Sequence, residues 1–209
     1  MKKIAMRALL MLLVLLPFGA CADDTPPDVL VRDTVREVLE IVQRDGGVLA
    51  DQRRLLELVD AKVLPHFDFA RMTRLAVGRA WRTATPEQQQ ALTAQFRTLL
   101  VRTYTKVFTT YRDPKVEVRP LQLAADAKEA TVQTVISVTG KTAKVDYEMG
   151  KTPTGWKAFD VTVEGVSLVT SYRGSFADEI QQHGVDGLIA KLAEANRNAA
   201  ANASRAQAK

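Results

Sequence analysis

The side chains able to carry catalysis or hold a metal are few, because the 209-residue chain has only two histidines and one cysteine. His66 lies two residues before Asp68, and such a pair could act as a general base with its orienting carboxylate. The spacing does not place both side chains on one face of the helix predicted to begin here, so a structural histidine is favoured. His183 precedes Gly184 at a predicted helix end, where a cation interacts favourably with the helix dipole.

Motifs of nucleotide-binding, hydrolytic and metal-dependent enzymes are missing from the sequence. It contains no Walker loop, no dinucleotide-binding glycine pattern, no Gly-x-Ser-x-Gly turn and no His-Glu-x-x-His helix. Gly165 follows a predicted strand without the further glycines of a phosphate loop, and is interpreted as a bend where the chain leaves a sheet. We therefore expect a protein that is not an enzyme and has no resident cofactor and no metal.

Residues 1–22 have the order of a secretory signal peptide. Basic residues come first, then an apolar run and then a small-residue cleavage site: Lys2, Lys3 and Arg7, residues 8–18, and Ala20 to Ala22. The apolar run is shorter than the about 20 residues that span a bilayer. We expect cleavage after Ala22 and export as a cysteine-free protein. Lipidation of Cys21 is the alternative, which Phe18 disfavours because an aliphatic residue is expected at its position.

Charge is unevenly distributed along the rest of the chain. The formal net charge of +5 falls to +2 without the leader's three basic residues, which removes the main support for a nucleic-acid partner. Residues 23–60 hold ten acidic and five basic residues, whereas residues 61–112 hold nine basic and two acidic ones. The basic segment is either an ordinary solvated surface or a docking site for an anionic headgroup or acidic partner. The docking hypothesis is assigned to Arg71, Arg74, Arg79 and Arg82.

Helical signals dominate the first half of the exported chain. A stripe of four valines predicts an amphipathic helix that ends at Asp45: Val31, Val35, Val38 and Val42. Asp51 is a predicted N-cap of the next helix, and a third is expected after Pro65, ending near Gly78. Thr85 and Gln88 around Pro86 form a capping box that predicts a fourth helix, to about residue 109.

The pattern then changes to alternation, which predicts strands. A strand is expected near Val116, and three more runs follow at 130–139, 144–149 and 159–163, joined by hairpin-length turns. Two further helices are predicted, one after Ser171 and one beginning at Asp186. Residues 196–209 are expected to be a disordered tail. The prediction is one α+β domain over 23–195, with helices packed on one face of a curved antiparallel sheet.

Several segments resemble the signatures of the MlaC family, also called the toluene-tolerance auxiliary family. They lie at residues 64–69, 75–78, 84–88, 96–97, 155–160, 164–170 and 184–188. The likeness covers about residues 28–195 in the order and spacing of the family, which often has a tyrosine at the position of His66.

This resemblance implies a periplasmic phospholipid carrier. Such a monomer would shuttle diacyl lipid between an outer-membrane lipoprotein complex and an inner-membrane ABC transporter with its substrate-binding subunit, and so maintain outer-membrane lipid asymmetry. It implies a fold of the nuclear-transport-factor-2-like class enclosing an apolar cavity. A periplasmic chaperone or adaptor, with an apolar groove for lipoprotein or peptide, is the first alternative, and a hydrolase without a recognisable motif is the second.

Only the resemblance favours cavity lining over ordinary core for the apolar side chains of the predicted elements. The candidates for contact with lipid are Met72, Leu75, Leu100, Tyr104, Tyr147, Phe159, Val166 and Leu168.

Overall fold

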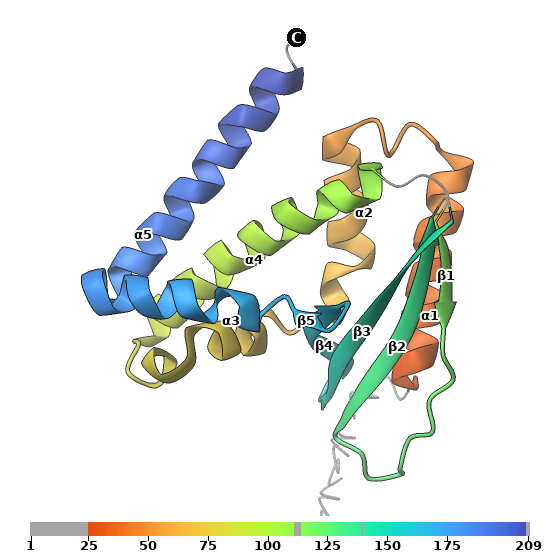
Figure 1. Cartoon of the computed structure of the whole chain (residues 1–209), viewed down its shortest axis with the longest axis horizontal. Coiled ribbons are helices and arrows are strands. Elements are labelled where there is room, and N and C mark those ends of the chain that lie inside the picture. Colours follow the sequence, from red (N-terminus) through yellow and green to blue (C-terminus); the bar gives the residue numbers. More distant parts are fainter. Residues whose placement is uncertain (1–24, 111–113, 139, 208–209) are drawn as a thin grey trace, which may run out of the picture.

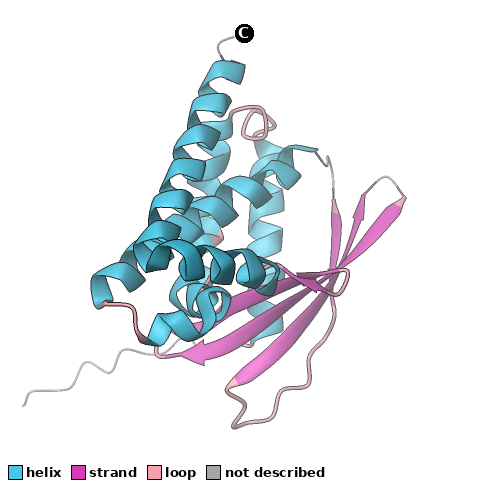
Figure 2. Ribbon diagram, turned by 60° about the vertical axis from the view of Figure 1, so that its left-hand side comes forward, coloured by secondary structure: helices cyan, strands magenta, loops and turns pink. Residues whose placement is uncertain are grey.

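Five α-helices and one five-stranded sheet make up residues 25–110, 114–138 and 140–207, which the computed structural model describes. The helices lie to one side of the sheet (Figure 1, Figure 2). Three short 3₁₀ segments, η1 (Leu64–His66), η2 (Gly78–Arg82) and η3 (Thr170–Tyr172), connect the elements. The predicted α+β class is therefore confirmed, with an antiparallel sheet and helices as its layers.

The first four helices begin and end close to the predicted residues. They are α1 (Pro27–Arg44), α2 (Gln52–Lys62), α3 (Phe69–Val77) and α4 (Pro86–Thr110). Asp51 caps α2 by accepting from the backbone N–H groups of Arg53 and Arg54. At α4, the backbone N–H of Thr85 donates to Gln88 Oε1 and that of Gln88 donates to Thr85 Oγ1. This reciprocal pair is the predicted capping box.

The last helix, α5 (Arg173–Gln207), differs from the prediction. It contains a kink at Gly184, with φ of 73° and ψ of −177°, where two separate helices were expected. The disordered tail predicted from Asn196 is wrong as far as Gln207, because the helix continues to that residue. Alanine is the strongest helix former, so an alanine-rich segment extends a helix that is already anchored. The end of α5 runs away from the rest of the molecule (Figure 1).

The sheet is an antiparallel meander in the order β1-β2-β3-β4-β5. Its strands are β1 (Lys115–Val118), β2 (Glu129–Val138), β3 (Lys141–Thr152), β4 (Gly155–Val163) and β5 (Val166–Ser167). Val132 lies opposite Tyr147, and Tyr147 lies opposite Val161, so these three side chains share one face. Polar pairs such as Gln133 and Asp146 occupy the other face.

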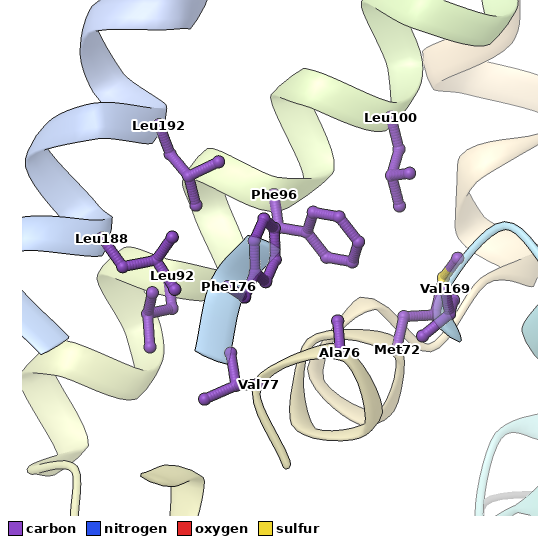
Figure 3. Packing of buried hydrophobic residues seen from close by; sticks show 10 residues of the cluster. All are labelled: Met72, Ala76, Val77, Leu92, Phe96, Leu100, Val169, Phe176, Leu188 and Leu192. Atoms are coloured by element: carbon purple, nitrogen blue, oxygen red, sulfur yellow. The ribbon is translucent and has the colours of Figure 1, made fainter. Parts of the chain in front are cut away.

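Buried apolar side chains form three separate clusters. The helical cluster joins α3, α4, η3 and α5 around Phe96 (Figure 3). The sheet cluster consists of Val132, Met149, Trp156 and Ala158, with Leu30 and Val31 of α1 packed against it. The third cluster, Val48, Leu55 and Val59, lies at α2. Phe67 packs against both the helical and the sheet cluster, and so lies between the two halves of the molecule.

Candidate lipid-binding site

Met72 and Leu100, two of the predicted lipid contacts, are members of the helical cluster. Their exposed fractions are 3% and 5%, so both side chains are closed into packed core in this structure. Together with Val169 they lie at the end of the cluster away from Leu188 and Leu192 (Figure 3). Lipid would reach these two residues only if the neighbouring side chains moved apart.

Leu75 and Tyr104 are half-buried and pack against the same cluster. Burial, followed by the charge and the hydrogen bond of neighbouring Tyr172, raises the pKa of Tyr104 to about 12. Tyr172 stacks edge-on against Phe96, with ring centroids 5.2 Å apart. The Tyr104 hydroxyl is therefore neutral and hydrogen-bonded at physiological pH, which suits an apolar lining.

Tyr147 lies on the apolar face of the sheet and packs against the sheet cluster. Burial raises the pKa of its hydroxyl, and a hydrogen bond with the Thr134 side chain acts in the opposite direction. Thr134 is 1% exposed and donates from Oγ1 to the carbonyl of Val145 at 2.8 Å. This polar pair is satisfied within the sheet, so the face presents an apolar surface to the helices.

Phe159 lies under the guanidinium of Arg71 instead of facing open space. The Arg71 Cζ atom is 3.4 Å from the ring centroid, and Arg71 Nη2 lies 2.5 Å from Glu129 Oε1. A Cβ atom added to Gly150 would come within 2.7 Å of Arg71 Nη1. Arg71 therefore joins α3 to strands β2, β3 and β4, and the expectation that it is a free docking cation is wrong.

Val166 and Leu168 follow a tight turn between β4 and β5. Glu164 and Gly165 both have positive φ, 49° and 81°, and Val163 pairs with Val166, as in a two-residue hairpin. Val166 is 61% exposed, so the expectation that it faces an enclosed surface is wrong for this structure. Leu168 is half-buried, and its backbone N–H donates to the carbonyl of Val161.

A buried carboxylate holds this end of the sheet in place. Asp160, 8% exposed, accepts from the backbone N–H groups of Val161 and Val169 and from the hydroxyl of Ser167. All three donors lie within nine residues of Asp160, so its carboxylate stabilises the turn between β4 and β5 and the segment that follows it.

Arg74, Arg79 and Arg82 are exposed on α3 and η2. Within the described residues none of the three is in an ion pair, in contrast to Arg71 and Arg97. The neighbouring Arg173 donates from Nε to the carbonyl of Leu75 and is also exposed. The structure thus leaves three of the four proposed docking cations free to meet an anionic surface.

Three of the four valines in the apolar stripe of α1 lie outside the buried clusters. Val35, Val38 and Val42 are half-buried, and in the described part of the chain none of them packs against the three clusters. On the sheet, Val145 and Val161 are buried on the face that turns toward the helices, yet they too lie outside the clusters. Apolar surface is therefore present on helix and sheet without being joined into one core, which is unusual for a single domain.

Two hollows open on the surface, and the sequence predicted neither. The first lies between α2 and α4, has a volume of about 320 Å³ and is lined by both apolar and charged side chains, Leu64 and Arg97 among them. The second, of about 260 Å³, lies beside the β3–β4 turn and includes His66, Trp156 and Lys157. The pairing of α2 with α4 is a long-range contact, so spacing along one helix could not reveal it.

In the described part of the chain, no group of three or more His, Cys, Asp or Glu side chains could hold a metal ion. The Nδ1 atom of His183 lies 2.8 Å from Glu179 Oε1. The pKa of the Glu179 carboxyl is lowered chiefly by its hydrogen bond with Lys191 and to a smaller extent by its interaction with His183. His66 is half-buried in η1. None of the described helices is long and apolar enough to cross a membrane.

Residues 32–194 match the model of the family described as MlaC protein. A solved structure from Ralstonia solanacearum, described as a phospholipid-binding protein in complex with a phospholipid, is 35% identical. It superimposes with a TM-score of 0.76, and the match covers 83% of this chain and 98% of the other.

Two curated proteins are similar over most of their length. The toluene tolerance protein ttg2D of Pseudomonas putida is 26% identical over 207 residues, 95% of this chain and 96% of the relative. The intermembrane phospholipid transport system binding protein MlaC of Haemophilus influenzae is 20% identical over 174 residues, 81% of each chain. The chain belongs to the MlaC family, which confirms the resemblance noted from its sequence segments.

Proposed function

We propose, from its membership of the MlaC family, that this chain is a periplasmic carrier of diacyl phospholipid. It carries lipid between two partners. One is an outer-membrane lipoprotein complex, and the other is an inner-membrane ABC transporter with its substrate-binding subunit. This exchange maintains the lipid asymmetry of the outer membrane. The 35% identical relative, solved with a phospholipid, supports the choice of cargo.

The division of the apolar core is the observation that carries this proposal. The helical and sheet clusters meet at Phe67, while three valines of the α1 stripe, Val35, Val38 and Val42, lie outside both clusters and are half-buried. An acyl chain against these half-buried valines would complete their burial. Every square ångström of apolar surface removed from water contributes about 25 cal/mol, so lipid and protein both gain from the contact.

The free energy of exposing acyl chains sets what the carrier must do. Each methylene contributes about 0.8 kcal/mol on burial, so two sixteen-carbon chains cost on the order of 20 to 25 kcal/mol to expose to water. A carrier in water must therefore cover both chains almost completely. Met72 and Leu100 would become lipid contacts when the helical cluster opens, and Leu75, Tyr104, Tyr147 and Leu168 would extend the lining.

Delivery requires contact with partners at membranes, and Arg74, Arg79 and Arg82 suit that role because they are exposed and unpaired among the described residues. No bond of the lipid is made or broken in this process. The proposal accordingly includes no catalytic residue and no cofactor besides the lipid cargo.

Organic extraction of the purified exported chain, followed by mass spectrometry, tests this proposal. Near-stoichiometric phospholipid is expected. A co-purifying peptide with no phospholipid would overturn it in favour of the chaperone or adaptor. An empty protein that also takes up no lipid from vesicles would overturn it as well.

A further inference from the structure

Four exposed arginines gather around the end of α3, and we call them the arginine face. They come from three segments of the chain: Arg74 from the last turn of α3, Arg79 and Arg82 from η2, and Arg173 from the start of α5. Among the described residues none of the four is in an ion pair, in contrast to Arg71 and Arg97. The face therefore carries positive charge that the protein itself leaves unbalanced.

Arg173 is the member of the face that the sequence did not predict. Its Nε donates to the carbonyl of Leu75 at 3.2 Å and lies 3.8 Å from a Cβ atom added to Gly78. Leu75 directly follows Arg74, and Gly78 directly precedes Arg79. The start of α5 thus brings a fourth cation to the junction of α3 and η2.

The two elements offer these cations no acidic neighbour, since residues 69–82 contain four arginines and neither Asp nor Glu. A cation near the carboxyl end of a helix interacts favourably with the helix dipole, which accounts for Arg74 and Arg173 at the end of α3. Arg79 and Arg82 lie beyond that helix, so the dipole does not account for them. Their positions favour a partner outside the chain.

An aromatic side chain lies between two of the cations. Trp81 stands between Arg79 and Arg82 in η2, is half-buried and packs against the helical cluster. Its carbonyl accepts from Gln89 Nε2 at 2.9 Å, which fastens η2 to α4. In Figure 1, η2 follows α3 on the side of the helical layer that lies away from the sheet. The face thus presents cations and a partly exposed indole from a backbone that is held in place.

We propose that the arginine face docks directly on an anionic bilayer surface, with its guanidinium groups on lipid phosphates and Trp81 at the level of the headgroups. Arginine binds phosphate through paired N–H donors, and tryptophan is enriched at membrane–water interfaces. The inference goes beyond the proposed function, because it makes the bilayer itself a partner in addition to the two membrane complexes.

The freedom of the cations favours a bilayer over an acidic protein as this partner. Arg74, Arg79 and Arg82 make no side-chain hydrogen bond within the described part of the chain, so they can adjust to the positions of lipid phosphates. Each arginine near an anionic membrane strengthens binding by about fivefold, so four of them give weak and reversible attachment. Reversible attachment suits a carrier that must leave one membrane to reach another.

Binding to vesicles made of lipid alone tests the inference, because such vesicles contain no protein partner. The exported chain is sedimented with vesicles of phosphatidylcholine, and with vesicles in which about one third of the lipid is phosphatidylglycerol. Binding is expected only to the second kind and should weaken as salt increases. Arg79→Gln/Arg82→Gln should weaken it about 10- to 30-fold, since each arginine contributes about fivefold.

Tryptophan fluorescence reports on the same contact independently. The emission of Trp81 should move to shorter wavelength on anionic vesicles, and Trp81→Phe should lose most of this shift. Trp156, the other tryptophan, is 3% exposed and lies in the sheet cluster, so it provides the background signal. A shift that is unchanged in Trp81→Phe would overturn the placement of Trp81 at the headgroups.

The matched control, Arg53→Gln/Arg197→Gln, removes the same charge at two exposed sites on α2 and α5 and should bind as the unmodified chain does. Equal binding of the two double variants overturns the assignment to the arginine face. Failure of the unmodified chain to bind anionic vesicles overturns the inference, and lipid delivery that still depends on Arg79 and Arg82 would then identify an acidic protein as the partner. Phospholipid content is measured on the same preparations, so a failure of the carrier function is seen separately.

Discussion

Val166 stands on β5 with 61% of its surface exposed, in the segment where lipid contact was predicted. Because the side chain is not core in this structure, Val166→Glu should leave the free energy of unfolding within about 0.5 kcal/mol. If acyl chain covers Val166 in the loaded protein, the new carboxylate would be buried without a partner, which costs several kcal/mol. We therefore expect a folded protein that has lost most of its phospholipid.

Thermal melting and lipid analysis on one preparation check this expectation, with Val166→Ala as the control that removes methyl groups without adding charge. A folded Val166→Glu protein carrying its full complement of lipid would show that Val166 lies outside the binding site.

Tyr104 gives the molecule a sensitivity to alkaline pH. Its pKa is raised to about 12 in the folded state, chiefly by burial, whereas an unfolded tyrosine titrates near 10. The folded protein therefore keeps a proton that the unfolded chain loses, and stability that is fully present below pH 10 is lost as the pH rises toward 12. Urea unfolding at pH 9 and pH 11 should show a smaller loss for Tyr104→Phe than for the unmodified chain. Equal losses in both would mean that Tyr104 contributes nothing to this pH dependence.

The kink in α5 requires a backbone conformation that favours glycine. Gly184 has φ of 73° and ψ of −177°, a conformation that is essentially limited to glycine. Gly184→Ala should lower the free energy of unfolding by about 1 to 3 kcal/mol through backbone strain, although nothing lies within 4 Å of the added Cβ.

Gly174→Ala is the matched control, since Gly174 is helical, exposed and also has nothing within 4 Å of an added Cβ. It should leave stability unchanged or raise it by up to about 1 kcal/mol. Urea unfolding compares the two variants. Equal stability of both would contradict the idea that the kink requires glycine.

Local signals predicted the elements well, and non-local packing explains what they missed. The capping box of Thr85 and Gln88 and the cap at Asp51 involve residues within three positions of each other, so they can be found from the sequence alone. The continuation of α5 depends on Asn196, which donates to Gln95 of α4 across 101 residues. Likewise, Arg71 matched the spacing of an exposed cation, but Glu129 and Phe159 hold it against the sheet.

The candidate site shows the same division between sequence and structure. Alternation placed Tyr147 on the apolar face of the sheet, and the family resemblance suggested a lining role for it. No pattern in α2 or α4 could indicate that Asp60 would face Arg97, because their pairing spans 37 residues. The hollow between these helices therefore emerges only when the helices are placed in space.

In the proposed function the exported chain acts as the carrier, and its first residue decides whether it moves freely. Residues 1–24 lie outside the described part, so the signal-peptide prediction remains a prediction. The intact mass of the exported protein should correspond to a chain that begins at Asp23. A mass that includes acylated Cys21 would contradict cleavage after Ala22 and would make the carrier a membrane-tethered protein.

Long-range electrostatics should govern how the whole molecule meets its partners. Arg79 and Arg82 are exposed on η2 and unpaired among the described residues, so their charge is available to an acidic surface. Arg79→Glu/Arg82→Glu should slow lipid delivery to liposomes that contain the inner-membrane partner by about threefold to tenfold at low salt. The unmodified chain should slow as salt increases, because the Debye length falls to about 8 Å at 0.15 M, and the variant should respond much less.

Arg53→Glu/Arg197→Glu changes the net charge equally at two exposed sites on α2 and α5 and should deliver lipid at the unmodified rate. Delivery kinetics followed over a salt series distinguish the cases. Unchanged transfer by Arg79→Glu/Arg82→Glu would mean that these arginines form an ordinary solvated surface. A loss shared with the control would mean that overall charge, rather than this face, sets the rate. Only a loss confined to the η2 variant identifies the face that the carrier turns toward its partner.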